Sequence, residues 1–100
     1  MKLLEFTSNG IYCSKADVYL DPWRGVKKAI ITHGHSDHAR WGSKSYITQI
    51  DNVPILKHRL GDIRVSGKKY GDKFQINGVT FSFHPAGHVP GSSQIRVEYK

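Results

Sequence analysis

A cluster of histidines limits what this chain can fold into. Residues 33–38 have the sequence His-Gly-His-Ser-Asp-His and follow, after Thr32, the apolar run Ala-Ile-Ile at residues 29–31. Imidazole and carboxylate ligands together suit zinc-type divalent ions. An apolar strand that ends in alternating histidines is a rigid edge from which His33 and His35 can project, and Gly34 adds no side chain between them. The spacing therefore predicts a buried strand that delivers a metal site at its end.

The other two potential ligands of this cluster are predicted to belong to a different element. Ser36 is a favourable N-cap for a short helix that continues through Arg40 and ends at Gly42. Asp37 and His38 would lie in the first turn of that helix and point away from the first two histidines, so they can serve a second ion. The alternative interpretation is that all these side chains lie on a solvated loop.

Most of the remaining chain is predicted to form short strands. Asn-Gly pairs at residues 9–10 and 77–78 lie between apolar runs, which is the strongest short-range signal for a β-hairpin. Helical spacing of apolar residues predicts one helix between Asn52, as its cap, and Gly61, as its stop. The strands are expected at residues 3–7, 10–13, 16–20, 28–32, 45–48, 73–76, 79–83 and 95–99.

The strand expected at residues 79–83 has a period of two. Val79, Phe81 and Phe83 are predicted to face a core, while the polar residues between them face the other side. His84 continues the polar side, and we expect it to have a structural role or to orient a metal ligand rather than to bind metal itself. His58, within the expected helix, is predicted to lie on the surface.

The sequence resembles the metallo-β-lactamase superfamily and, within it, the β-CASP nucleases. The pattern His-x-His-x-Asp-His after a hydrophobic strand is similar to the metal-binding motif of the superfamily. The likeness to β-CASP nucleases lies in residues 21–24 (DPWR), 39–42 (ARWG) and 85–92 (PAGHVPGS). Among them, the chain is most similar to the bacterial exonucleases associated with DNA ligase, which are described as resembling the messenger-RNA 3′-end processing nuclease. The resemblance extends from residue 10 to residue 98.

This resemblance implies an α+β fold with mostly antiparallel or mixed sheet and one or two short helices. Residues 1–100 would be the N-terminal portion of a metallo-β-lactamase αββα sandwich, without its second half and the inserted β-CASP domain. No linker, low-complexity tract or repeat occurs in the chain, so a single domain is expected. The strand at residues 95–99 would have a free edge, and we expect self-association through it.

The resemblance also assigns roles to the histidines. His88 becomes the third ligand of the ion held by His33 and His35, with a fourth position open for water. Asp37, which is given a catalytic role, and His38 would hold a second ion, whose further ligands are implied to lie beyond residue 100. The expected metal is zinc, with two ions in a longer parent and one in this chain, and manganese as an alternative. The implied reaction is phosphodiester hydrolysis in nucleic acid, with little or no activity in the 100 residues alone.

The charge of the chain agrees with a nucleic-acid partner. Fifteen Lys and Arg against eight Asp and Glu give a formal charge of +7 and a pI near 9.7, and a positive field attracts phosphate backbones. The basic residues are scattered, with adjacent pairs at residues 27–28 and 68–69. An ordinary solvated basic surface is therefore the competing explanation. Arg40 and Lys44 are further candidates for phosphate contacts.

Other features set the expected location and partners. Cys13 is the only cysteine and cannot form an internal disulfide, and residues 1–5 contain no apolar signal core. No apolar stretch approaches the roughly 20 residues that cross a bilayer, so we expect a cytoplasmic protein without membrane association. The sequence contexts of residues 21–24 and 38–41 favour DNA over RNA, and association with a DNA ligase is implied by the resemblance alone.

Two other functions stay open on the sequence. An RNA-cleaving relative from the 3′-end processing branch would share the metal motif. A stand-alone module that binds zinc or nucleic acid without catalysis would fit the short chain and its positive charge. Salt-sensitive binding without hydrolysis, after saturation with zinc or manganese, would favour the module. Hydrolysis of small molecules, as in lactamases, would leave the charge and the flanking motifs unexplained.

Overall fold

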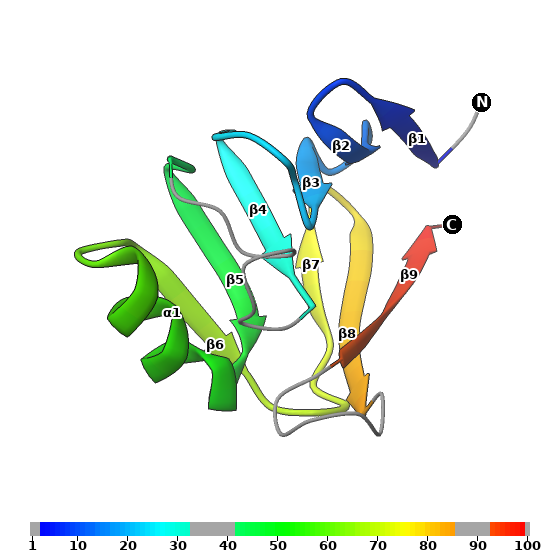
Figure 1. Ribbon diagram of the computed structural model, residues 1–100. Helices are drawn as coiled ribbons and strands as arrows, with labels where there is room; N and C mark the ends of the chain where they lie inside the picture. The colour runs from blue at the N-terminus through cyan, green and yellow to red at the C-terminus, as the bar shows by residue number, and fades with distance from the viewer. Residues whose placement is uncertain (1–2, 33–41, 86–92, 100) are drawn as a thin grey trace.

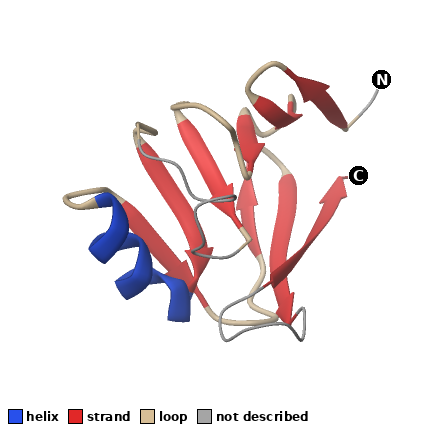
Figure 2. Ribbon diagram, in the orientation of Figure 1, coloured by secondary structure: helices blue, strands red, loops and turns tan. Residues whose placement is uncertain are grey.

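The computed structural model describes residues 3–32, 42–85 and 93–99. This part of the chain is rich in strands, with one α-helix at a side of the molecule (Figures 1 and 2). The strands are β1 (Leu4–Thr7), β2 (Gly10–Cys13), β3 (Val18–Leu20), β4 (Lys28–Ile31), β5 (Ser45–Gln49), β6 (Val65–Lys68), β7 (Phe74–Ile76), β8 (Val79–Pro85) and β9 (Ser93–Tyr99). A 3-10 turn, η1 (Ile50–Asn52), leads into α1 (Val53–Leu60).

The strands form two sheets. Strands β1 to β6 lie side by side in sequence order, antiparallel from β1 to β3 and parallel from β3 to β6. Strands β7, β8 and β9 form a separate antiparallel sheet. The helix α1 lies in the connection between the parallel strands β5 and β6, which need a crossover. The described chain is therefore an α+β structure with mixed and antiparallel sheets, as predicted.

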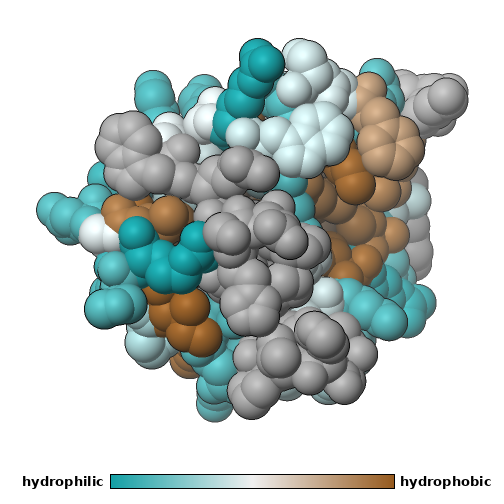
Figure 3. Space-filling model, viewed as in Figure 1, coloured by the Kyte–Doolittle hydropathy of each residue, from teal (hydrophilic) through white to brown (hydrophobic). Residues whose placement is uncertain are grey.

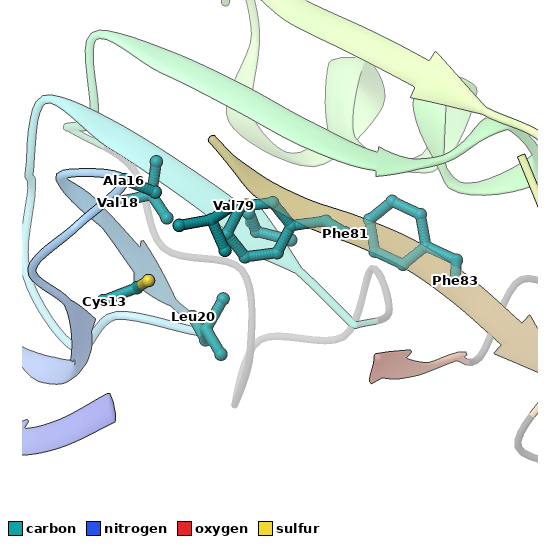
Figure 4. Packing of buried hydrophobic residues seen from close by; sticks show 8 residues of the cluster. Cys13, Ala16, Val18, Leu20, Val79, Phe81 and Phe83 are labelled. Atoms are coloured by element: carbon teal, nitrogen blue, oxygen red, sulfur yellow. The ribbon is translucent and has the colours of Figure 1, made fainter. Parts of the chain in front are cut away.

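Strand β4 lies between two hydrophobic cores. Ile30 faces the three-stranded sheet and belongs to the same buried cluster as Phe81 of β8. Figure 4 shows the buried side chains of β8 beside those of β2 and β3. Ala29 and Ile31 point to the other face and pack with Leu56 of α1. The layers are therefore helix, sheet and sheet, and burial on both faces explains why residues 29–31 are all apolar.

Both predicted hairpins are present. Asn77 and Gly78 join β7 to β8 with φ values of +51° and +82°, as a type I′ turn requires. In the first hairpin, residues 8–9 form the turn and Gly10, with φ +129°, begins β2. A Cβ atom on Gly10 would lie 3.0 Å from Cα of Pro22. This glycine therefore also permits the close approach of the segment that follows β3.

The strand after the second hairpin has the predicted core face. Val79, Phe81 and Phe83 are fully buried. Strand β8 continues two residues further than predicted, because His84 and Pro85 also pair with β9.

Some predicted details differ from the structure. Strand β3 begins at Val18 rather than at residue 16, and β6 has no counterpart in the sequence prediction because it contains a single large apolar side chain. The predicted helix forms and ends at Gly61, but the side chain of Asn52 makes no capping hydrogen bond. Asn52 is buried, and its Nδ2 donates to Oγ1 of Thr48 at 3.1 Å. The prediction of a side-chain cap at Asn52 is therefore wrong.

Strands β1 and β9 are edge strands among the described residues. On them, Leu4, Phe6 and Tyr99 are 38%, 85% and 47% exposed. Figure 3 shows hydrophobic side chains gathered on the side of the molecule where Figure 1 places these two strands. Exposed apolar surface of this kind favours association with another chain.

Candidate metal centre

The predicted metal ligands lie outside the described residues. The first gap, residues 33–41, contains His33, His35, Asp37 and His38, and the second gap, residues 86–92, contains His88. The flanking residues are described: Thr32 and Gly42 border the first segment, and Pro85 and Ser93 border the second. The structure therefore shows how the ends of both segments are held, and the ligand roles stay predictions.

Asp21 fixes the residue directly before His33. Its carboxylate accepts the backbone N–H of Thr32 at 2.8 Å and the Thr32 hydroxyl at 2.7 Å, while its own N–H donates to the carbonyl of Ile30 at 2.9 Å. Asp21 has φ +45°, which is uncommon for a residue with a side chain. Hydrogen bonds to a charged group contribute about 1.5–3 kcal/mol each, which offsets the cost of this conformation. The end of β3 thus holds the end of β4 where the metal motif begins.

A buried polar network holds the same end of β4 from the other side. Oγ1 of Thr48, on β5, donates to the carbonyl of Ile31 at 3.0 Å and accepts Nδ2 of Asn52 at 3.1 Å. Thr48 and Asn52 are almost completely buried, and buried polar groups need such partners. No sequence pattern predicted this role for Asp21 or Thr48. The signal available was that both lie at the carboxyl ends of the strands expected on either side of the metal-bearing strand.

The β3–β4 loop, residues 21–27, also touches the other end of the first undescribed segment. A Cβ atom on Gly25 would lie 2.6 Å from the carbonyl oxygen of Gly42, so the two backbones are in contact and only glycine fits. The loop begins at Asp21, which binds Thr32. One loop therefore contacts both described residues that flank residues 33–41, Thr32 and Gly42.

Strand β8, which precedes His88 in the sequence, runs toward the end of the molecule where β4 finishes. Strands β4 and β8 run in the same direction in Figure 1, and Ile30 and Phe83 belong to one buried cluster. Pro85, the last residue of β8, therefore lies toward the end where β4 finishes. A site shared by His33 and His88 requires this arrangement of the two strands.

The remaining histidines and aspartates of the described segments form no group of three that could hold a metal. His58 is exposed on α1, as predicted. His84 is half-buried on β8, and its Nε2 lies 2.8 Å from Oγ of Ser82, a contact that agrees with a structural role. The backbone N–H of Asp51 donates to Oε1 of Gln49 at 2.8 Å at the start of η1.

Two further polar features belong to other parts of the molecule. A pocket of about 600 Å³ on the three-stranded sheet is lined by Lys73, Gln75, Gly78, Thr80 and Glu98. Gly78 is in the turn that begins β8, at the opposite end of that strand from Pro85. On β2, the Tyr12 hydroxyl donates to Oδ1 of Asp17 at 2.8 Å, and this hydrogen bond raises the pKa of Tyr12 to about 12.

Comparison with known proteins gives a partial match. No protein-family model matches the chain. The chain is 29% identical over 96 residues to a protein named "Probable DNA ligase" from Opitutus terrae, and the match covers 92% of the chain but 9% of that protein. A crystal structure of a protein of unknown function from Enterococcus faecalis V583 matches with a TM-score of 0.59 and 15% identity, over 72% of the chain and 22% of that protein. The second match shows a shared fold alone. The chain is therefore similar to a small part of a probable DNA ligase and shares its fold with part of a longer protein.

Proposed function

We propose that this chain is the metal-binding portion of a metal-dependent phosphodiester hydrolase that acts on nucleic acid, and that the longer protein is a DNA exonuclease. The observation that carries the proposal is the position of the motif at residues 33–38, directly after the buried strand β4. Asp21 and Thr48 hold the end of that strand from both sides. A functional site needs this kind of rigid support, because small errors in ligand position weaken binding strongly.

The proposed donors fit zinc. His33, His35 and His88 would supply three imidazoles and leave a fourth position open, as in catalytic zinc sites. Zinc bound in this way lowers the pKa of its water to about 7 and stabilises charge on a phosphate. Asp37 and His38 would serve a second ion, and Asp37 would also have the catalytic role. Manganese is the alternative metal.

The second ion would have too few ligands within these residues. Asp37 and His38 supply two, and Asp51, Asp62 and Asp72 do not occur in a context that resembles the missing bridging motif. We therefore propose that the 100 residues bind one metal ion well and turn over substrate slowly or not at all.

DNA is the proposed substrate. The likeness to a protein named "Probable DNA ligase" supports a role in DNA metabolism, and the net charge of +7 suits a polyanion. Association with a DNA ligase and a cytoplasmic location belong to the same proposal. In the described ranges, no helix has the length and apolarity that a membrane span needs.

Metal analysis combined with a phosphodiester assay tests this proposal. We expect the purified chain to hold one zinc ion per molecule and to cleave oligonucleotides at close to the background rate. Rapid cleavage at one zinc per chain would contradict the proposal that the 100 residues bind metal but turn over substrate slowly or not at all. Failure to retain zinc at one ion per chain would contradict the proposal as a whole.

A non-catalytic module that binds zinc and nucleic acid is the second candidate, supported by the positive charge. The longer protein, saturated with zinc or manganese, distinguishes the candidates. Binding that weakens with salt and occurs without hydrolysis would support the module. Preferential cleavage of RNA would support a nuclease of the 3′-end processing kind.

We also propose that two copies of the chain pair through β9. An antiparallel pair centred on Val97 would place Arg96 of each copy opposite Glu98 of the other, and Ile95 opposite Tyr99. Within one copy, Nε of Arg96 lies 3.4 Å from Oε1 of Glu98, and the two side chains keep 65% and 38% of their areas exposed. The edge of β9 is therefore self-complementary in both charge and apolar contact.

Charge reversal on β9 tests the pairing. Arg96→Glu is expected to weaken the dimer about tenfold, because like charges then face each other at both pairs. The double variant Arg96→Glu/Glu98→Arg should restore it. Sedimentation at tens of micromolar measures the effect, and a clean monomer of the unchanged chain at that concentration would rule the pairing out.

A further inference from the structure

The β3–β4 loop carries an exposed aromatic ring beside a cation. The side chain of Trp23 is 50% exposed, whereas most of a tryptophan side chain is ordinarily covered in a folded protein. Arg24, the next residue, is exposed as well. The described residues therefore leave about half of Trp23 uncovered, and this exposed area is available to a ligand.

Backbone hydrogen bonds hold this loop on both sides of the ring. The N–H of Trp23 donates to the carbonyl of Asn9 at 2.8 Å, in the turn between β1 and β2. The N–H of Val26 donates to Oγ of Ser43 at 3.1 Å, and its carbonyl accepts the N–H of Lys44 at 2.9 Å. A loop held in this way needs little further ordering when it binds a ligand, which favours affinity.

The loop also contacts the two described residues on either side of residues 33–41. Asp21 binds Thr32, and Gly25 touches Gly42. Trp23 lies between these two attachments in the sequence. A ligand bound on its ring would therefore lie on the loop that contacts Thr32 and Gly42.

The formal charge of residues 22–50 is mostly positive. Residues 22–50 contain five basic residues and one acidic residue, Asp37; the basic residues are Arg24, Lys27, Lys28, Arg40 and Lys44. Lys28 pairs with Ser45 in the register of β4 and β5, so it lies close to Lys44. Lys28 and Lys44 are both exposed. Exposed lysines therefore lie at the starts of β4 and β5, and Lys44 is hydrogen-bonded through its backbone to Val26, two residues after Arg24.

We propose that Trp23, together with Arg24 and Lys44, forms a platform for single-stranded nucleic acid. One base would stack on the exposed indole face, and neighbouring phosphates would contact the two cations. Stacking combined with a positive track is the usual means by which proteins bind single strands without sequence preference. A paired base in a duplex is already stacked on both faces, so the platform favours a single strand. The choice of nucleic acid as the ligand rests on the proposed function.

Fluorescence of Trp23 tests the platform directly. The chain has two tryptophans, so Trp41→Phe leaves Trp23 as the only one. With EDTA present, an oligothymidylate of about 12 nucleotides should quench its emission, and a duplex of the same length should quench much less. In a polarisation assay with a labelled strand, Trp23→Ala should bind about tenfold more weakly, while Trp23→Phe, which keeps a ring, should lose less than about threefold. Quenching by oligouridylate in a parallel titration would support the platform equally and would show that RNA is accepted.

Matched variants separate the platform from general charge and from misfolding. The slope of log affinity against log salt concentration reports the number of phosphate contacts. Arg24→Ala and Lys44→Ala should each reduce this slope by the equivalent of about one phosphate contact. Lys57→Ala removes an exposed charge on α1 and should leave this slope unchanged. Phe6→Ala removes an exposed ring on β1 and should also leave it unchanged. Thermal unfolding checks that each variant is folded.

Equal affinity of Trp23→Ala and Trp23→Phe, or the absence of quenching by either single strand, would overturn the platform. Hydrolysis plays no part in EDTA, so this result is independent of the metal analysis that tests the proposed function. Stoichiometric zinc with no role for Trp23 would refute the platform alone. A working platform on a chain that binds no zinc would refute the metal site alone.

Discussion

Replacing His88 with alanine should lower the zinc affinity of the chain at least about 100-fold, and replacing His33 should do the same. Loss of a group that merely orients a ligand costs about 10- to 100-fold in metal affinity, so loss of a ligand should reach or exceed the upper end of that range. The two histidines are far apart in the sequence, and an equal loss from both would mean that they share one ion. Competition with a chromogenic chelator measures the affinity.

Two other histidines serve as matched controls for this prediction. His58→Ala, on the exposed face of α1, should leave zinc affinity unchanged. His84→Ala removes the contact with Ser82 and should change it less than about tenfold. Zinc at 100 times its dissociation constant should also stabilise the unchanged chain by about 2.7 kcal/mol, and both ligand variants should lose this gain. Retention of full affinity by His88→Ala would mean that the ion is held by residues 33–38 alone.

Local sequence patterns predicted most of the strands because their signals are local. The Asn77-Gly78 turn specifies its own conformation, since both residues accept positive φ. The period of two in β8 predicted the core face, because a one-residue shift in register would move Val79, Phe81 and Phe83 together away from that face. The run at residues 29–31 predicted a buried strand, and the structure covers this strand with α1 on one side and β8 on the other.

The parts that sequence patterns missed depend on contacts between distant segments. Strand β6 contains Gly67, where a Cβ atom would lie 2.9 Å from Cγ2 of Val53 in α1. This strand is therefore positioned by its close packing against α1, and its sequence has no hydrophobic pattern that would predict it. Asn52 has a residue type typical of helix caps, but its burial beside Thr48 turns the amide to a different partner. The hydrogen bond that Thr32 donates to Asp21 forms because β3 and β4 are parallel neighbours. For the site, the sequence identified candidate ligands, and the fold added the residues that hold their flanks.

Removal of the Asp21 carboxylate should produce the second large effect. Asp21→Gly deletes both acceptors of Thr32 and tolerates the φ of +45° without strain. Two hydrogen bonds to a charged group, at about 1.5 kcal/mol or more each, predict a loss of about 3 kcal/mol in the free energy of unfolding. For a domain of about 100 residues this corresponds to a fall in Tm of more than about 10 °C. Thermal unfolding followed by circular dichroism measures the shift.

Asp21→Asn separates the effect of the carboxylate from the effect of the backbone conformation. Asparagine also accepts positive φ and keeps one carbonyl oxygen for the N–H of Thr32, so we expect it to cost about 1 kcal/mol. Measured well below the Tm, zinc affinity should fall about tenfold or more in Asp21→Gly and less in Asp21→Asn, because Thr32 directly precedes His33. Lys57→Ala should change neither quantity. A lowered Tm with unchanged zinc affinity would mean that Asp21 ties β3 to β4 without any influence on the metal ligands.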